Sequence, residues 1–186
     1  MEHRTEDELT AALPELRAAP ADVGRLEMIV RRPAVDEREV LEEGELDLTV
    51  GLVGDTWQDR GSSRTDDGSS HPDMQLNVMS ARMVDLIAGS RDRWALAGDQ
   101  LYVDLDLSGA NLPPGTRLHL GDEAVIEVTD QPHLGCAKFT RRFGLPAHRF
   151  VNSELGKELH LRGINAKVAV PGTIRAGDQI KVERPG

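Results

Sequence analysis

The chain contains one cysteine, Cys136, and this thiol is the side chain best suited to chemistry. It lies within residues 131–153, a window that contains no aspartate or glutamate. The cations of this window are Lys138, Arg141, Arg142 and Arg149. They oppose the charge of the whole chain, which is −10. Because nearby cations favour the thiolate over the thiol, the setting predicts a reactive or metal-binding sulfur.

The same window offers a place for an anionic ligand such as a phosphate. If a helix begins at Gly135–Cys136, its free N–H groups add to the positive potential around the thiol. Two alternatives remain open. A lone cysteine is commonly a small buried hydrophobe, and a basic window can be a solvated face that balances acidic neighbours.

Several other kinds of site are excluded by the absence of their motifs. The six histidines show neither HxH nor HExxH spacing, and no CxxC occurs, so a zinc site is not expected. The phosphate-binding patterns GxxxxGK[ST] and GxGxxG are missing, and so is the GxSxG elbow of serine hydrolases. Cys136 therefore remains the main candidate for catalysis.

Composition limits the partners and the compartment. The chain has 186 residues and a pI of about 5.0, which argues against binding to nucleic acid or to anionic lipid. One cysteine cannot form an internal disulfide, the polar start MEHRTEDELT has no apolar h-region, and no apolar run is long enough to span a membrane. We therefore expect a cytoplasmic protein without nucleic-acid or membrane partners.

The elements that would position Cys136 are mainly strands. Three Gly-Asp turns, at Gly98, Gly121 and Gly177, each precede a segment of alternating apolar residues. Further strands are predicted at 23–32, 74–80 and 164–174, and a helix that Ser80 caps at 81–89. This spacing predicts a small β-barrel or sandwich with a few short helices, in which a helical crossover carries the cysteine.

The chain divides into a short extension and one domain. Residues 1–20 form an N-terminal extension, either helical, with a capping box of Thr5 and Glu8, or frayed. Residues 21–186 form the domain. Within it, residues 54–73 are rich in Gly, Ser and Asp and are expected to be flexible, either as a mobile lid or as a disordered insertion.

Two stretches carry a family resemblance. They are GDQLYVDLDLSGANLPPGTRLHLGDEAVIEVTDQPHLGCAKFTRRFG, from Gly98, and LRGINAKVAVPGTIRAGDQIKVER, which ends at Arg184. Together with GLVGD at 51–55 they resemble the MOSC domain, the C-terminal module of molybdenum cofactor sulfurases that also occurs as stand-alone bacterial proteins. The resemblance implies a small β-barrel of the MOSC type.

The resemblance also implies a ligand, the molybdenum cofactor, which is an anionic pterin phosphate that holds its metal through sulfur. Cys136 matches the family cysteine, regarded as a metal ligand or as a carrier of persulfide sulfur. The residues implied to hold the cofactor are Lys138, Arg141, Arg142, Arg162 and Asp55. Soft sulfur suits molybdenum, and the basic window suits the phosphate.

The implied reaction is either sulfur transfer to the cofactor or a cofactor-dependent reduction, with a sulfur-donor or redox protein as partner. The departures from the family pattern favour an alternative, a non-catalytic β-barrel module that has lost the cofactor chemistry. Thr56 and Trp57 stand where many relatives have a basic residue, and Gly98-Asp99-Gln100 stands where they often have Gly-Glu-Asn. Family descriptions also mention pyridoxal phosphate, but this sequence shows no domain with a lysine that would bind that cofactor.

Overall fold

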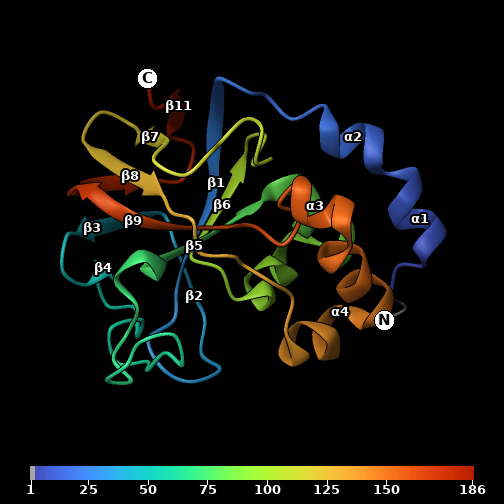
Figure 1. Cartoon of the computed structure of the whole chain (residues 1–186), viewed down its shortest axis with the longest axis horizontal. Helices are drawn as coiled ribbons and strands as arrows, with labels where there is room; N and C mark the ends of the chain where they lie inside the picture. The colour runs from blue at the N-terminus through green and yellow to red at the C-terminus, as the bar shows by residue number, and fades with distance from the viewer. Residues whose placement is uncertain (1–2) are drawn as a thin grey trace.

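A closed β-barrel of seven strands forms the centre of the computed structural model, which describes residues 3–186 (Figure 1). The strands follow one another around the barrel in the order β11, β7, β8, β9, β5, β6 and β1, and pairing of β11 with β1 closes it. Their bounds are β1 Val23–Arg31, β5 Leu76–Ser80, β6 Leu101–Asp104, β7 Arg117–Leu120, β8 Ala124–Val128, β9 Ile164–Val170 and β11 Gln179–Glu183. The prediction of a mainly β, barrel-like fold is confirmed.

One neighbouring pair, β5 with β6, is parallel, and the other pairs of the barrel are antiparallel. Parallel neighbours need a crossover between them, which here consists of the helix α3 (Ala81–Ala88) and the 3-10 helix η2 (Arg91–Ala97). The predicted caps of α3 are confirmed. The Ser80 hydroxyl accepts a hydrogen bond from Met83 N, and Gly89 ends the helix with a φ of 74°.

A second, smaller sheet lies beside the barrel. It consists of β10 (Gly172–Arg175), β3 (Glu43–Asp47) and β4 (Gly51–Leu52), paired in that order. The short strand β2 (Glu39–Leu41) pairs with β1 outside the closed ring.

Two hydrophobic clusters fill the molecule. The first lies inside the barrel and is wholly aliphatic, as the low aromatic content of the chain requires. The second lies between the barrel wall and the helices. Strand β6 serves both, because successive side chains of a strand point to opposite faces: Leu101 and Val103 join the first cluster and Tyr102 joins the second.

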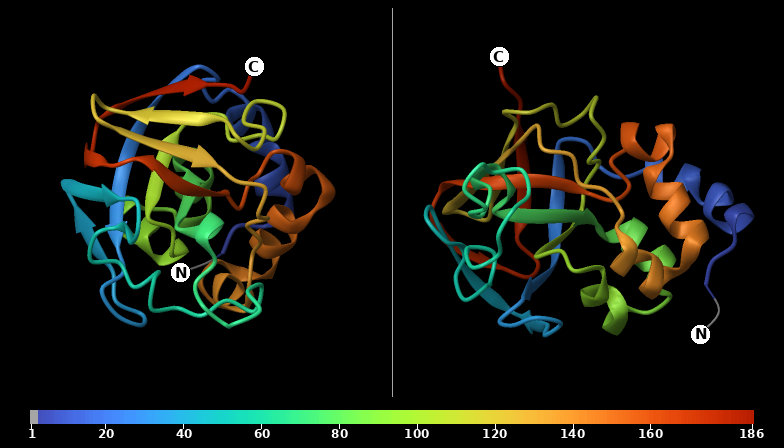
Figure 2. Two further views of the ribbon diagram at one scale, coloured as in Figure 1. Left: turned by 60° about the vertical axis from the view of Figure 1, so that its left-hand side comes forward. Right: turned by 60° about the horizontal axis from the view of Figure 1, so that its bottom comes forward.

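The α-helices gather on one side of the barrel, as the right-hand view of Figure 2 shows. Between β8 and β9 the chain forms α4 (Ala137–Asn152) and α5 (Glu154–Glu158), so the predicted helical crossover is confirmed. None of the helices within residues 3–186 is long and apolar enough to cross a membrane.

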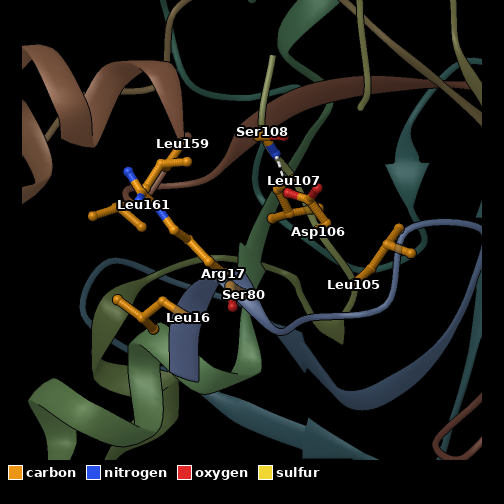
Figure 3. Close-up of a pocket in the computed structure, with 9 residues that line it drawn as sticks. All are labelled: Leu16, Arg17, Ser80, Leu105, Asp106, Leu107, Ser108, Leu159 and Leu161. Atoms are coloured by element: carbon orange, nitrogen blue, oxygen red, sulfur yellow. Dashed lines mark hydrogen bonds between the residues drawn. The ribbon is translucent and has the colours of Figure 1, made fainter. Parts of the chain in front are cut away.

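Two short helices lie in the N-terminal segment. They are α1 (Glu6–Ala11) and α2 (Leu13–Arg17), and the capping box of Thr5 and Glu8 is present. Leu9 of α1 is buried in the second cluster. Leu16 and Arg17 of α2 line a small cavity of about 70 Å³ against the barrel (Figure 3).

The three Gly-Asp turns have the predicted left-handed glycines, with φ of 91° at Gly98, 61° at Gly121 and 96° at Gly177.

Residues 54–73 contain no strand, and the short 3-10 helix η1 (Pro72–Met74) begins near their end. Ser62 N donates to Ser69 O across this loop. Its flexibility stays a prediction.

Candidate functional site

Cys136 lies at the edge of a cavity of about 360 Å³, and its side chain is exposed. The alternative of a small buried hydrophobe is therefore wrong. The residue is the N-cap of α4, as expected for a helix that begins at Gly135–Cys136. The cavity lies between this end of α4, the β1–β2 connection, Arg60 and the turn at Gly98.

The first segment of α4 is anchored by aromatic side chains and is short. Phe139 and Phe143 are buried, with ring centroids 5.1 Å apart. The helix then kinks at Gly144, whose φ is 88° and ψ 164°. The segment that begins at Cys136 is therefore only about two turns long.

Five cationic side chains and one carboxylate line the cavity with Cys136. The cations are Arg38, Arg60, Lys138, Arg142 and Arg162, and the carboxylate is Asp36. Asp36 sits on the rim, 3.2 Å from Arg142 Nη2 and 3.6 Å from Lys138 Nζ. The structure thus brings three predicted residues, Lys138, Arg142 and Arg162, to the cavity that Cys136 lines, and adds Arg38 and Arg60.

Two of these guanidinium groups have an unused donor. The Nε atoms of Arg38 and Arg162 are buried and have no hydrogen-bond partner. Burial and the neighbouring charges of Arg142 and Arg32 lower the pKa of Arg38. Burial and Arg32 likewise lower the pKa of Arg60. An anion in the cavity would offset the repulsion between these cations.

Arg162 is held in place from behind the cavity. Its Nη1 lies 2.9 and 2.7 Å from the two carboxylate oxygens of Asp99, and its Nη2 donates to Ala97 O at 3.1 Å. Its Cζ lies 5.0 Å from the centre of the Phe139 ring. Asp99 also accepts from His133 Nε2 at 2.7 Å.

This buried group carries shifted pKa values. Burial opposes ionisation of Asp99, yet Arg162 and His133 hold its pKa below the ordinary value. Burial and the charge of Arg162 lower the pKa of His133 and outweigh the opposing effect of Asp99. The arrangement is therefore an ion pair of Asp99 and Arg162 beside a neutral imidazole.

Asp55 does not reach the cavity of Cys136. Its carboxylate is buried in an ion pair with Arg32, with Oδ1 2.7 Å from Nη2 and Oδ2 2.8 Å from Nε. It also accepts from Trp57 N at 2.9 Å. Asp55 thus positions Arg32, which borders a smaller cavity of about 160 Å³ that Arg60 also lines.

Arg141 and Arg149 also lie away from the thiol. Arg141 is exposed and does not line the cavity, although Arg142 beside it does. Arg149 lies 3.5 Å from Glu6 Oε1 on the surface. Two of the four cations of the basic window therefore lie on a solvated face, which is the alternative interpretation of this window.

Three residues of the candidate site are missed by reasoning from the sequence. Arg38 lies in a charged stretch without a motif, and Arg60 lies in the loop at 54–73, which is rich in Gly, Ser and Asp. Asp99 was read as a turn aspartate, because it follows Gly98 as Asp122 follows Gly121. Nothing local in the sequence separates these two aspartates.

Few side chains of the described residues are placed to bind a metal ion. Among residues 3–186, no three His, Cys, Asp or Glu side chains come together in a group that could hold a metal ion. A metal at Cys136 would therefore need further donor atoms from a bound ligand.

A sequence model described as the MOSC domain matches residues 66–181, which is more than half of the chain. A search of curated proteins gives no match. Among solved structures the chain is similar to the YuaD protein from Bacillus subtilis, with a TM-score of 0.66 and 16% identity over 88% of this chain and 97% of that one.

Two further solved structures are YiiM proteins. The one from Escherichia coli has a TM-score of 0.55 and 22% identity over 87% of this chain and 71% of that one. The one from Geobacillus stearothermophilus has a TM-score of 0.56 and 14% identity over 88% and 76%. At these identities the likeness shows a shared fold.

Proposed function

The chain belongs to the MOSC domain family, and from this premise we propose that it binds the molybdenum cofactor in the cavity beside Cys136. The observation that supports this most is an exposed thiol at the edge of a cavity that five cationic side chains line. A pterin phosphate brings the negative charge that this lining favours.

The residues of the cavity fit the parts of this cofactor. The Cys136 thiolate is a soft ligand of the kind that molybdenum accepts, and the cofactor's own sulfur atoms would complete the coordination. The positive charges of Arg38, Arg60, Lys138, Arg142 and Arg162 would attract the phosphate or the pterin. When bound, the cofactor would supply a redox-active metal that accepts sulfur or electrons.

Two uses of Cys136 are open within this proposal. As a metal ligand it would serve a reduction, for which a redox partner must supply electrons. As a sulfur carrier, its thiolate would attack the terminal sulfur of a donor persulfide. The new S–S bond would make a Cys136 persulfide, and the donor would leave as a thiolate.

The second candidate function is a non-catalytic binding module. The observation that favours it is the position of Asp55, which the family resemblance placed at the cofactor but which the structure turns toward Arg32. Under this alternative the cavity would bind an anion without metal chemistry.

Molybdenum and pterin content distinguish these candidates. The chain is purified anaerobically from a host that makes the cofactor, and metal and oxidised-pterin fluorescence are measured. We expect both in the unmodified protein, and loss of metal in Cys136→Ser. Equal metal in the two proteins would contradict ligation by the thiol. Absence of pterin from the unmodified protein would favour the binding module.

A further inference from the structure

A second cavity, of about 430 Å³, opens where the chain leaves β8 and returns to β9. Its walls come from residues 109–114, from residues 128–134, from both helices of the crossover and from residues 160–164. It shares no lining residue with the cavity of Cys136. It is therefore a separate site.

The walls of this second cavity are mainly apolar. The apolar side chains are those of Leu112, Pro114, Val128, Pro132, Leu134, Val151 and Ile164. Leu134 is 44% exposed, which is high for leucine and keeps one wall open to solvent. The volume and lining match those of small-molecule sites, which are concave, largely apolar and carry a few polar groups.

The charged side chains of the cavity balance one another. Lys157 and Asp130 both line it, and both are exposed. No other lysine, arginine, aspartate or glutamate of the described residues lines it. The lining therefore favours a neutral ligand, in contrast to the cavity of Cys136.

Two histidines give the cavity its hydrogen-bonding character. His160 Nδ1 lies 2.7 Å from Leu107 O, and a carbonyl can only accept, so Nδ1 carries the proton. His133 Nε2 lies 2.7 Å from a carboxylate oxygen of Asp99 and carries its proton for the same reason. The pKa of His133 is lowered, so its other ring nitrogen is an acceptor. An acceptor in the cavity favours a ligand with a donor.

We propose that the second cavity binds a small, neutral, largely apolar organic molecule that carries a hydroxyl or N–H group. This site goes beyond the proposed function and needs no molybdenum cofactor. It is joined to the cavity of Cys136 by one buried chain of contacts, from His133 through Asp99 to Arg162. A ligand that contacts His133 would therefore lie next to Asp99, which holds Arg162 in place.

Fluorine NMR with a matched pair of probes tests the site. We expect 4-fluorophenol to bind the full chain, without cofactor, at least about tenfold more tightly than fluorobenzene, because only the phenol has a donor. Equal affinities would overturn the hydrogen-bonding part of the proposal. No saturable binding of either probe would overturn the site.

A matched pair of leucines locates the binding. Leu134→Glu should weaken 4-fluorophenol binding by about tenfold or more, because it replaces an apolar wall with a charge. Leu145→Glu is the control, since Leu145 is 47% exposed and lines neither cavity. Equal effects of the two substitutions would overturn the location.

Amide shifts in the unmodified protein give a readout that does not depend on any variant. With 4-fluorophenol present, the shifts should move at residues 128–134 and 157–164 and should stay constant at Arg38 and Arg60. The opposite pattern would place the probe in the cavity of Cys136. Molybdenum content should be the same in Leu134→Glu and the unmodified protein, so failure of this proposal and failure of the cofactor proposal are distinguishable.

Discussion

Asp99 and Arg162 form a buried ion pair in which one guanidinium nitrogen lies within 2.9 Å of both carboxylate oxygens. The side chain of Asp99 is 0% exposed and that of Arg162 is 7% exposed. The pair links the turn at Gly98 to the start of β9 and fixes an arginine at the wall of the Cys136 cavity. It is the support on which the proposed cofactor site depends.

The first prediction concerns this pair. Asp99→Asn should lower the free energy of unfolding by about 3–5 kcal/mol, because it leaves the Arg162 charge buried without its partner. Urea unfolding measures the effect. Asp36→Asn, on the exposed rim, should change stability by less than about 0.5 kcal/mol. Similar effects of the two substitutions would contradict the role of the buried pair.

The second prediction compares adjacent arginines of α4. Arg142 lines the cavity and Arg141 does not. Arg142→Ala should weaken binding of a pterin phosphate by about tenfold, in keeping with the loss of one charged hydrogen bond. Arg141→Ala should change it less than about twofold. Titration calorimetry with both variants makes the comparison, and equal losses would indicate attraction by the general charge of the helix.

The third prediction concerns pH. The pKa of His133 is lowered in the folded state, so between this value and about 6.5, the unfolded value, the unfolded chain binds more protons. Stability is therefore full above about pH 6.5 and falls as the pH is lowered toward the folded pKa. We expect His133→Gln to show a smaller loss of unfolding free energy between pH 7 and 5 than the unmodified protein. Parallel curves in chemical denaturation would contradict this.

The fourth prediction compares two glycines with positive φ. Gly163, with φ of 116°, follows Arg162, and an added Cβ would collide with the carbonyl oxygen of Val78. Gly89, with φ of 74°, has open space around it. Gly89→Ala should cost about 1–2 kcal/mol from backbone strain alone. Gly163→Ala should cost more, and thermal or urea unfolding decides the order.

The fold could be predicted from the sequence because its signals are local. Alternating apolar residues define strands, and the glycines at 98, 121 and 177 do adopt the positive φ that tight turns need. The caps of α1 and α3 could be read from Thr5, Glu8, Ser80 and Gly89, since each acts within one helical turn.

The site could be predicted only where its residues surround the cysteine in sequence. The acid-free window determined that a basic region would accompany Cys136, and it included Lys138 and Arg142. Which arginines face the thiol was decided by the tertiary structure. Arg141 and Arg142 are neighbours in sequence, but consecutive residues point in different directions on a helix.

The tertiary structure alone decided the roles of Arg38, Arg60, Asp55 and Asp99. Barrel closure brings the β1–β2 connection, the loop at 54–73 and the turn at Gly98 to the start of α4. A carboxylate buried there must pair with a cation, because burial of an isolated charge is costly. Asp55 therefore pairs with Arg32 and Asp99 with Arg162, and these pairings depend on contacts between distant segments that no local pattern in the sequence records.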